Sequence, residues 1–174
     1  MENALIPGAK WVLEAPGAGN LARVPLLLTV PHSGHGLPPE ADWLRALAPE
    51  ALLTDLDLLV DELYLPVISK FRLPALVAQV HRYAVDLNRY PSDIDAESVE
   101  GAATPAGTFP MGFHWIYTTL GEKILPRPLP SALHDLWVRV YHDRFHEEFA
   151  RGVAAVRSGF PGQAVYHLDC HSMP

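Results

Sequence analysis

The chain has 174 residues, of which 49% are hydrophobic and 19% are charged, and its formal net charge is −7 at pH 7. This length fits a single domain covering residues 1–174, and the composition excludes an intrinsically disordered chain. The 13 Lys and Arg residues are scattered, which argues against a nucleic-acid partner because phosphate contacts need clustered cations. We therefore expect a small-molecule partner.

The sequence also argues against a membrane-spanning or secreted protein. Its longest apolar stretches, such as VPLLLTVP at 24–31, are far shorter than the roughly 20 residues that a membrane-spanning helix needs. Residues 1–10 lack the basic and apolar regions of a signal peptide. Cys170 is the only cysteine, so a disulfide framework is excluded. We expect a cytoplasmic protein.

The first half of the chain predicts two buried strands with helices between them. The predicted elements are a strand over 24–31, helices over 39–48 and 56–71, and a strand over 75–80. Thr54 or Asp55 is expected to cap the second helix. Pro66 predicts a kink or an early end within it.

The second half of the chain predicts a long loop, a long helix and a last strand. Residues 91–130 are rich in Gly, Pro, Ser and Thr, which is typical of a loop, and 114–118 can form a short strand in it. Ser131 is expected to cap a helix whose apolar residues recur at spacings of three and four. The apolar segment 164–168 is the last predicted strand. This order favours an α/β fold with a mostly parallel or mixed sheet and flanking helices.

Polar residues follow three of the predicted strands. They are HSGH at 32–35, DLNR at 86–89 and DCHS at 169–172, and ligands of open α/β sheets gather at the carboxyl ends of the strands. Two histidines and one carboxylate with an open position make a hydrolytic zinc site. Taken singly, each histidine fits a structural hydrogen bond, and Asp55 and Asp57 fit a helix cap. The combination favours a site.

Five sequence blocks resemble the N-formylglutamate amidohydrolase (deformylase) family and follow its order. They are PHSG at 31–34, TDLDLLVDELY at 54–64, RYAVDLNR at 82–89, YH at 141–142 and DCHSM at 169–173. The VDLNR and HS elements also resemble those of zinc carboxypeptidases, whose α/β fold this family shares. The resemblance implies a zinc-dependent amide hydrolase that removes the formyl group from N-formyl-L-glutamate, giving formate and glutamate in histidine degradation.

The resemblance also implies a ligand set for one zinc ion, namely His32, Asp57 and His171. Asp55 competes with Asp57 for the carboxylate position. His35 is a further alternative, because it stands where the carboxypeptidase pattern has its glutamate ligand. Asp169 is expected to accept a hydrogen bond from an imidazole of the site.

For the substrate, the resemblance implies that Arg89 and Asn88 hold a carboxylate, which suits a planar guanidinium. Arg82 is either a second cation for the substrate or a partner of Asp86. His142, on the long helix, is expected to face the pocket.

The general base of the families that this chain resembles is a glutamate on a late strand, which would lie beyond Pro174. The chain is therefore expected to lack the family's C-terminal third and to be slow in catalysis, and Glu40 and Asp86 are the internal candidates for the base. The strand over 164–168 would then be an exposed sheet edge, and dimerisation or aggregation is its expected consequence. The alternatives are a deacylase of another N-acyl amino acid or peptide, and a metal-binding domain without catalysis.

Overall fold

The computed structural model describes residues 8–13 and 22–172. In chain order the elements are β1 (Ala9–Leu13), β2 (Leu26–Val30), α1 (Asp42–Arg45), α2 (Pro49–Leu53), α3 (Val60–Phe71), β3 (Ala75–Ala78), α4 (Ser131–Trp137), the π-helical turn η1 (Val138–His142), α5 (Asp143–Gly159) and β4 (Tyr166–Asp169). None of the helices in these ranges is both long and apolar enough to cross a membrane.

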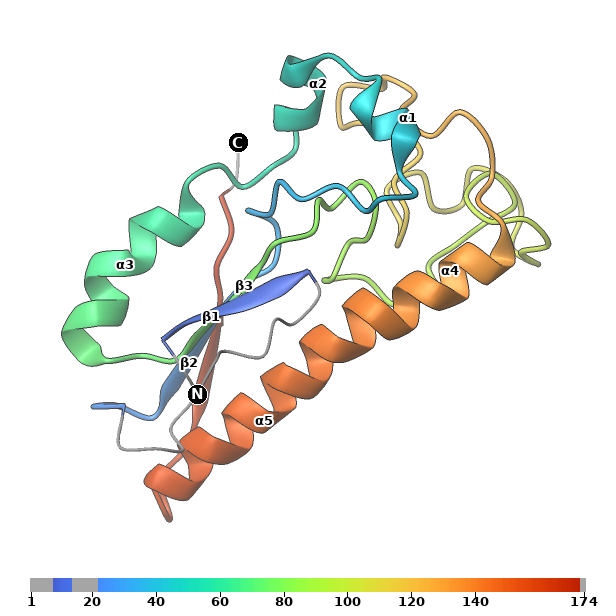
Figure 1. Cartoon of the computed structure of the whole chain (residues 1–174). Helices are drawn as coiled ribbons and strands as arrows, with labels where there is room; N and C mark the ends of the chain where they lie inside the picture. The colour runs from blue at the N-terminus through green and yellow to red at the C-terminus, as the bar shows by residue number, and fades with distance from the viewer. Residues whose placement is uncertain (1–7, 14–21, 173–174) are drawn as a thin grey trace.

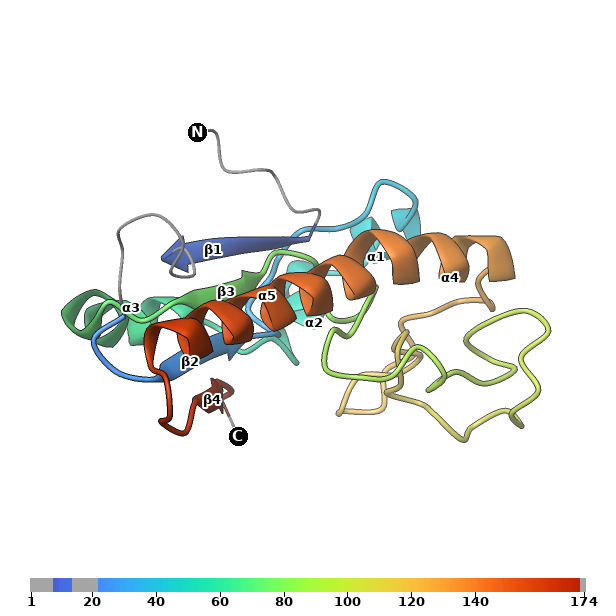
Figure 2. The ribbon, with the colours of Figure 1, turned by 90° about the horizontal axis from the view of Figure 1, so that it is seen from below.

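The four strands form one mixed sheet in the order β1-β3-β2-β4. β2 is parallel to both β3 and β4, and β1 is antiparallel to β3. Helix α3 covers one face of this sheet, and the continuous helix from α4 through η1 to α5 runs along the other (Figures 1 and 2). The α/β fold with a mixed sheet and flanking helices is therefore confirmed.

Alternating side chains of the sheet build a core on each of its faces. Leu28 and Val77 pack on the α3 side with Val60 and Ile68 of that helix. On the opposite face α5 approaches closely at Gly152, where a Cβ atom would lie 2.6 Å from the Leu27 side chain. The two cores fix the height of the helices above the strands and thereby the position of the loops at the strand ends.

The helices between β2 and β3 differ from the sequence prediction. The predicted helix over 39–48 is shorter, since α1 covers Asp42–Arg45, and the helix α2 that follows at Pro49–Leu53 was not predicted. Helix α3 begins at Val60 rather than at residue 56, because Leu59 takes a left-handed conformation with φ of 60° and serves as its N-cap. Neither Thr54 nor Asp55 caps it. Pro66 lies within α3, which continues past it to Phe71.

Other departures involve β1 and the segments around the long helix. β1 was not predicted from the sequence, and it occupies the edge next to β3. The segment 114–118 forms isolated bridges instead of a strand. Ser131 begins α4 without capping it, since Pro130 is the N-cap. The π-helical turn at Val138–His142 widens the helix and shifts the direction of its later side chains.

Two buried histidines, both neutral, anchor the segment that follows β3. His81 Nε2 donates to the Leu52 carbonyl (2.9 Å) and its Nδ1 accepts from the Tyr83 amide (3.1 Å). His114 Nδ1 donates to the Ala84 carbonyl (2.5 Å). Burial lowers the pKa of His81 to about 4 and that of His114 to about 3.

These histidines predict that stability falls with acidification. The unfolded chain protonates each imidazole below its ordinary pKa of 6.5, whereas the folded chain does not until pH 3 to 4, so acid favours unfolding. Each histidine should lower the free energy of unfolding by about 2 kcal/mol between pH 7 and pH 5. Urea unfolding at both pH values measures this loss. The His81→Gln variant should lose less between the two pH values than the wild type, and an equal loss would contradict the assignment.

Candidate metal centre

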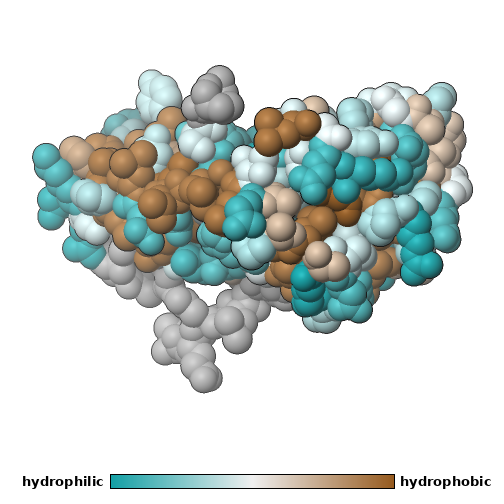
Figure 3. Space-filling model, turned by 90° about the horizontal axis from the view of Figure 1, so that it is seen from above, coloured by the Kyte–Doolittle hydropathy of each residue, from teal (hydrophilic) through white to brown (hydrophobic). Residues whose placement is uncertain are grey.

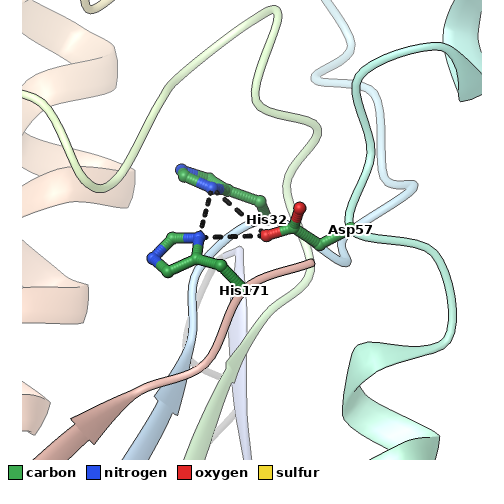
Figure 4. Close-up of side chains that lie close together, drawn as sticks. All are labelled: His32, Asp57 and His171. Carbon is green, nitrogen blue, oxygen red and sulfur yellow. Dashed lines mark hydrogen bonds and ion pairs between the residues drawn. The ribbon is translucent and has the colours of Figure 1, made fainter. Parts of the chain in front are cut away.

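Three side chains converge at the carboxyl ends of the parallel strands. His32 follows β2, His171 follows β4, and Asp57 lies in the turn before α3, where its amide donates to the His32 carbonyl (3.1 Å). Asp57 Oδ2 lies 3.0 Å from His171 Nδ1 and 3.5 Å from His32 Nδ1, and the two Nδ1 atoms are 3.2 Å apart (Figure 4). One ligand atom from each residue thus lies within 4.8 Å of the others, which can hold a metal ion.

A second set of side chains orients these three. His32 Nε2 is 2.8 Å from Asp86 Oδ1, and His171 Nε2 is 3.0 Å from Asp169 Oδ2. Because each outer ring nitrogen is held by a carboxylate, both Nδ1 atoms are turned toward the centre of the cluster, the arrangement typical of metal-binding histidines. Asp169 thus has the position that the sequence predicted.

The charges of the cluster reinforce one another. Burial by itself lowers the pKa of His32, but hydrogen bonds to Asp57 and Asp86 outweigh it, and the pKa is raised. Burial raises the pKa of Asp57, whereas hydrogen bonds from His32 and Ser172 outweigh it and the pKa is lowered. The hydrogen bonds within the cluster thus outweigh the effect of burial on both His32 and Asp57.

Asp86 is fully buried and binds four partners. Besides its contact with His32, the Asp86 carboxylate accepts hydrogen bonds from the Arg82 guanidinium (3.1 Å), the Trp115 indole (3.0 Å) and the backbone amide of Asn88 (3.0 Å). Its pKa is lowered, because the hydrogen bond and charge of His32 outweigh the effect of burial. A carboxylate enclosed in this way cannot take a proton from a substrate-side water, so Asp86 is a positioning residue and not the general base.

A pocket of about 620 Å³ adjoins the cluster. Asp57 and Ser172 line it on the cluster side, and Arg82, Arg89 and Trp115 are among its other walls. A second pocket of about 330 Å³ is lined by Leu87, Asn88, Arg89, Tyr90, His142 and His146. Arg89 lines both pockets, and its guanidinium forms no ion pair within the described ranges.

Comparisons with known proteins identify the family of this chain. The profile of the N-formylglutamate amidohydrolase family matches residues 24–174. The chain belongs to this family. It is similar to the solved N-formylglutamate amidohydrolase from Ralstonia eutropha JMP134, with a TM-score of 0.75 and 25% identity over 97% of this chain and 59% of that one. A search of curated protein sequences found no match.

A second solved structure, a gene product of Agrobacterium tumefaciens, supports the fold alone. Its TM-score is 0.66 at 18% identity, over 95% of this chain and 56% of that one. The chain of this family member therefore spans less than two thirds of the length of either solved protein.

Two alternative ligands named from the sequence lie outside the cluster. Asp55 accepts hydrogen bonds from the Tyr83 hydroxyl (2.6 Å) and from the backbone amide of Thr119 (3.2 Å), which anchors the loop over the larger pocket. His35 is exposed, and the cluster found among the described residues does not include it. His32, Asp57 and His171 are thus the set that the fold brings together among the described residues.

Glu40 and Arg82 also differ from what the sequence indicated. Glu40 accepts from the Trp137 indole (3.3 Å) and lines a separate pocket next to Trp43, so it is not placed to act as the base. Arg82 takes the alternative role of pairing with Asp86, and its other terminal nitrogen donates to the Asp55 carbonyl (3.0 Å). Arg82 can therefore act on a ligand through its positive charge, but both of its terminal nitrogens already donate hydrogen bonds within the protein.

His146 is a site residue that the sequence reasoning missed. Its ring contacts that of His142 at a tilt of 45° with centroids 4.3 Å apart, and its Nε2 donates to the Leu87 carbonyl (3.0 Å). This bond fixes the turn that carries Asn88 and Arg89. The only sequence signal for it was the i,i+4 spacing from His142, which places both rings on one face of a helix.

We expect His32→Ala and His171→Ala to abolish stoichiometric zinc binding, because each removes one of three ligands. Asp57→Asn should weaken binding by more than about tenfold, the least that even an outer partner of a ligand usually contributes. Asp55→Asn is the matched control and should bind zinc as the wild type does. Metal analysis after dialysis measures all four variants, and zinc retained by both alanine variants would refute the ligand set.

Proposed function

We propose that the chain hydrolyses the formyl amide of N-formyl-L-glutamate with one bound zinc ion, releasing formate and glutamate. The observation that carries this proposal is the convergence of His32, Asp57 and His171 beside an arginine-lined pocket. Membership of the N-formylglutamate amidohydrolase family supports it. The solved relative from Ralstonia eutropha bears the name of that activity.

The donor set fits zinc. Hydrolytic zinc sites use three protein ligands, commonly imidazole nitrogens and a carboxylate oxygen, and leave a further position open. A bound zinc ion supplies Lewis-acid polarisation of a carbonyl and makes a water molecule more acidic. The protein's own part is to orient the ligands: Asp86 and Asp169 hold the outer nitrogens of His32 and His171, and Ser172 donates to Asp57 Oδ1 (3.0 Å).

The substrate's carboxylates are assigned to the turn after Asp86. Arg89 can present a bidentate fork to a carboxylate, and it lines both pockets beside the cluster. Asn88 Nδ2 lies 3.4 Å from His171 Nε2, so a carboxylate bound at this turn would lie beside one of the histidines of the cluster. His142 adds a polar group to the smaller pocket, and Arg82 adds positive charge from the wall of the larger one.

Proton transfer is the weak step of this site. The two carboxylates that line the larger pocket, Asp55 and Asp57, already accept hydrogen bonds from other side chains. A general base usually contributes about 10² to 10⁴-fold. We therefore expect the described residues to support slow hydrolysis.

A different acyl group is the second candidate for the substrate. The larger pocket has a volume of about 620 Å³ and includes Met111, Trp115 and Leu120 among its walls, which is more apolar space than a formyl group fills. A longer N-acyl amino acid fits the same chemistry. A cytoplasmic location and a place in histidine degradation stay predictions.

Hydrolysis of N-acyl-L-glutamates by the zinc-loaded protein tests the proposal. We expect release of formate from N-formylglutamate at a kcat about 10² to 10⁴-fold below that of the Ralstonia eutropha enzyme, because the described residues place no free carboxylate to act as general base. Faster hydrolysis of N-acetyl- or N-butyrylglutamate would select the other deacylase. Bound zinc with no turnover of any of them would select a metal-binding domain without catalysis.

Arg89→Met is expected to weaken binding of L-glutamate, the product, by about ten- to a hundred-fold, since it removes a charged hydrogen bond. Calorimetry on the zinc-loaded protein measures this. Arg127→Met, in the separate pocket near Glu40, is the matched control and should bind glutamate normally. Zinc content should stay unchanged in both variants, and unaltered glutamate affinity in Arg89→Met would remove Arg89 from the site.

A further inference from the structure

Asp55 joins three segments of the chain that meet beside the larger pocket. Its carboxylate accepts hydrogen bonds from the Tyr83 hydroxyl (2.6 Å), from the Thr119 backbone amide (3.2 Å) and from the Thr119 hydroxyl. Its backbone carbonyl accepts a hydrogen bond from the Arg82 guanidinium (3.0 Å). The turn that follows α2 is thereby connected to the segment after β3 and to the loop around Thr119.

A buried ring orients the Asp55 carboxylate. Tyr83 is 1% exposed, and its ring contacts the rings of His81 and Trp115, with centroids 4.7 and 5.5 Å away. Because this ring is fixed by packing, its hydroxyl group holds Asp55 Oδ2 in one position. The two bonds from Thr119 therefore fix the loop to an aspartate that is already held in place.

Residues 119–122 are the exposed tip of a turn, and they depend on this contact. The base of the turn is an antiparallel bridge between Tyr117 and Lys123. Within the described ranges, the hydrogen bonds that join the tip to the rest of the protein are the two from Thr119 to Asp55. The other hydrogen bonds of the tip stay within the turn. The position of the tip relative to the body of the protein is thus set by Asp55.

The tip forms one wall of the larger pocket. Thr119 and Leu120 line this pocket of about 620 Å³, as do Met111 and Trp115, and Arg89 adds positive charge to the lining. Figure 3 views the molecule from the side on which α2 lies, and hydrophobic and hydrophilic side chains both reach the surface there. A pocket with an apolar lining and a few polar groups fits a ligand that has one apolar and one charged end.

We propose that Asp55 is a positioning residue, which holds the tip at Thr119 and Leu120 as the wall that contacts the acyl group of an N-acyl-L-glutamate. Asp55 stands two residues before Asp57, so one turn positions both this wall and a ligand of the metal centre. A wall that is already in place lowers the entropic cost of ligand binding, because no loop has to be ordered. The proposal rests on the proposed function only in placing the acyl group in the larger pocket.

Binding of a hydrolysis-inert ligand to the zinc-loaded protein tests this role. N-butylsulfonyl-L-glutamate carries an apolar chain in place of the acyl group, whereas L-glutamate carries none, and calorimetry gives both dissociation constants. Thr119→Val removes the hydroxyl bond at nearly constant volume and should weaken binding of the sulfonyl ligand by about three- to fivefold. Thr119→Ser keeps the hydroxyl and should bind as the wild type does. Glutamate affinity and zinc content should stay unchanged in both variants.

A double-mutant cycle shows whether Asp55 acts through the loop. Asp55→Ala should weaken binding of the sulfonyl ligand by about tenfold, and adding Thr119→Val should weaken it no further, because the two residues form one contact. Thr108→Val is the matched control, since it removes another exposed threonine hydroxyl bond, to the Pro105 carbonyl (2.6 Å), away from the pocket. Circular dichroism checks folding. Thr119 is exposed, so its variants test the proposal even if Asp55→Ala does not fold.

Three results would overturn the proposal: unchanged affinity for the sulfonyl ligand in Thr119→Val, an equal loss of glutamate affinity, or additive effects in the cycle. A wild type that binds the sulfonyl ligand no more tightly than glutamate would also overturn it, because the wall would then not contact the apolar chain. None of these measurements depends on turnover. The expected binding pattern in a protein that hydrolyses no N-acyl-L-glutamate would refute the proposed function and leave the role of Asp55 intact.

Discussion

The hydrogen bond between His32 and the buried carboxylate of Asp86 is the contact on which the site depends. It joins the end of β2 to the segment after β3, and these two strands are parallel neighbours in the sheet. The carboxylate is stable at 0% exposure only because the Arg82 guanidinium, an indole and a backbone amide share its charge. Removing one of these partners would leave a buried charge poorly satisfied, which costs far more than a surface contact does.

This dependence explains how several polar side chains are held together at one edge of the sheet. The imidazole of His32 is fixed by Asp86 on its outer side, and its inner nitrogen faces Asp57 and His171. The turn at Asp57 is fixed by the hydrogen bond from the Asp57 backbone amide to the His32 carbonyl and by the left-handed conformation of Leu59. Arg89 and Asn88 follow Asp86 directly, so the same anchor places the groups assigned to the substrate.

The sequence predicted the elements that bury a long apolar run and missed those defined by pairing. β2, β3 and the helix that follows Ser131 were predicted because continuous apolar residues or a spacing of three and four mark them. β1 carries no such mark, since its place comes from antiparallel pairing with β3, a contact between distant segments. The start of α3 was placed too early because apolar periodicity continues through 56–59, whereas the backbone turns at Leu59 to bring Asp57 to His32.

The residues of the site also fall into those that the sequence indicated and those that it missed. Motif resemblance indicated His32, Asp57 and His171, and the fold brings these three together. Resemblance could not assign roles that depend on partners far apart in the chain, such as the four hydrogen bonds that enclose Asp86. His146 was missed for the same reason, because its role is a bond to a carbonyl 59 residues away. Spacing along the chain identifies ligands more readily than it identifies the groups that hold them.

The position of His171 depends on the pairing of β4 with β2. His171 stands two residues after β4, and its ring is held from two sides, by Asp57 at Nδ1 and by Asp169 at Nε2. Asp169 is the last residue of β4, and it accepts a hydrogen bond from the Thr29 hydroxyl of β2 (2.6 Å). The register of these two strands therefore sets the position of Asp169, and Asp169 in turn orients the imidazole that reaches the cluster.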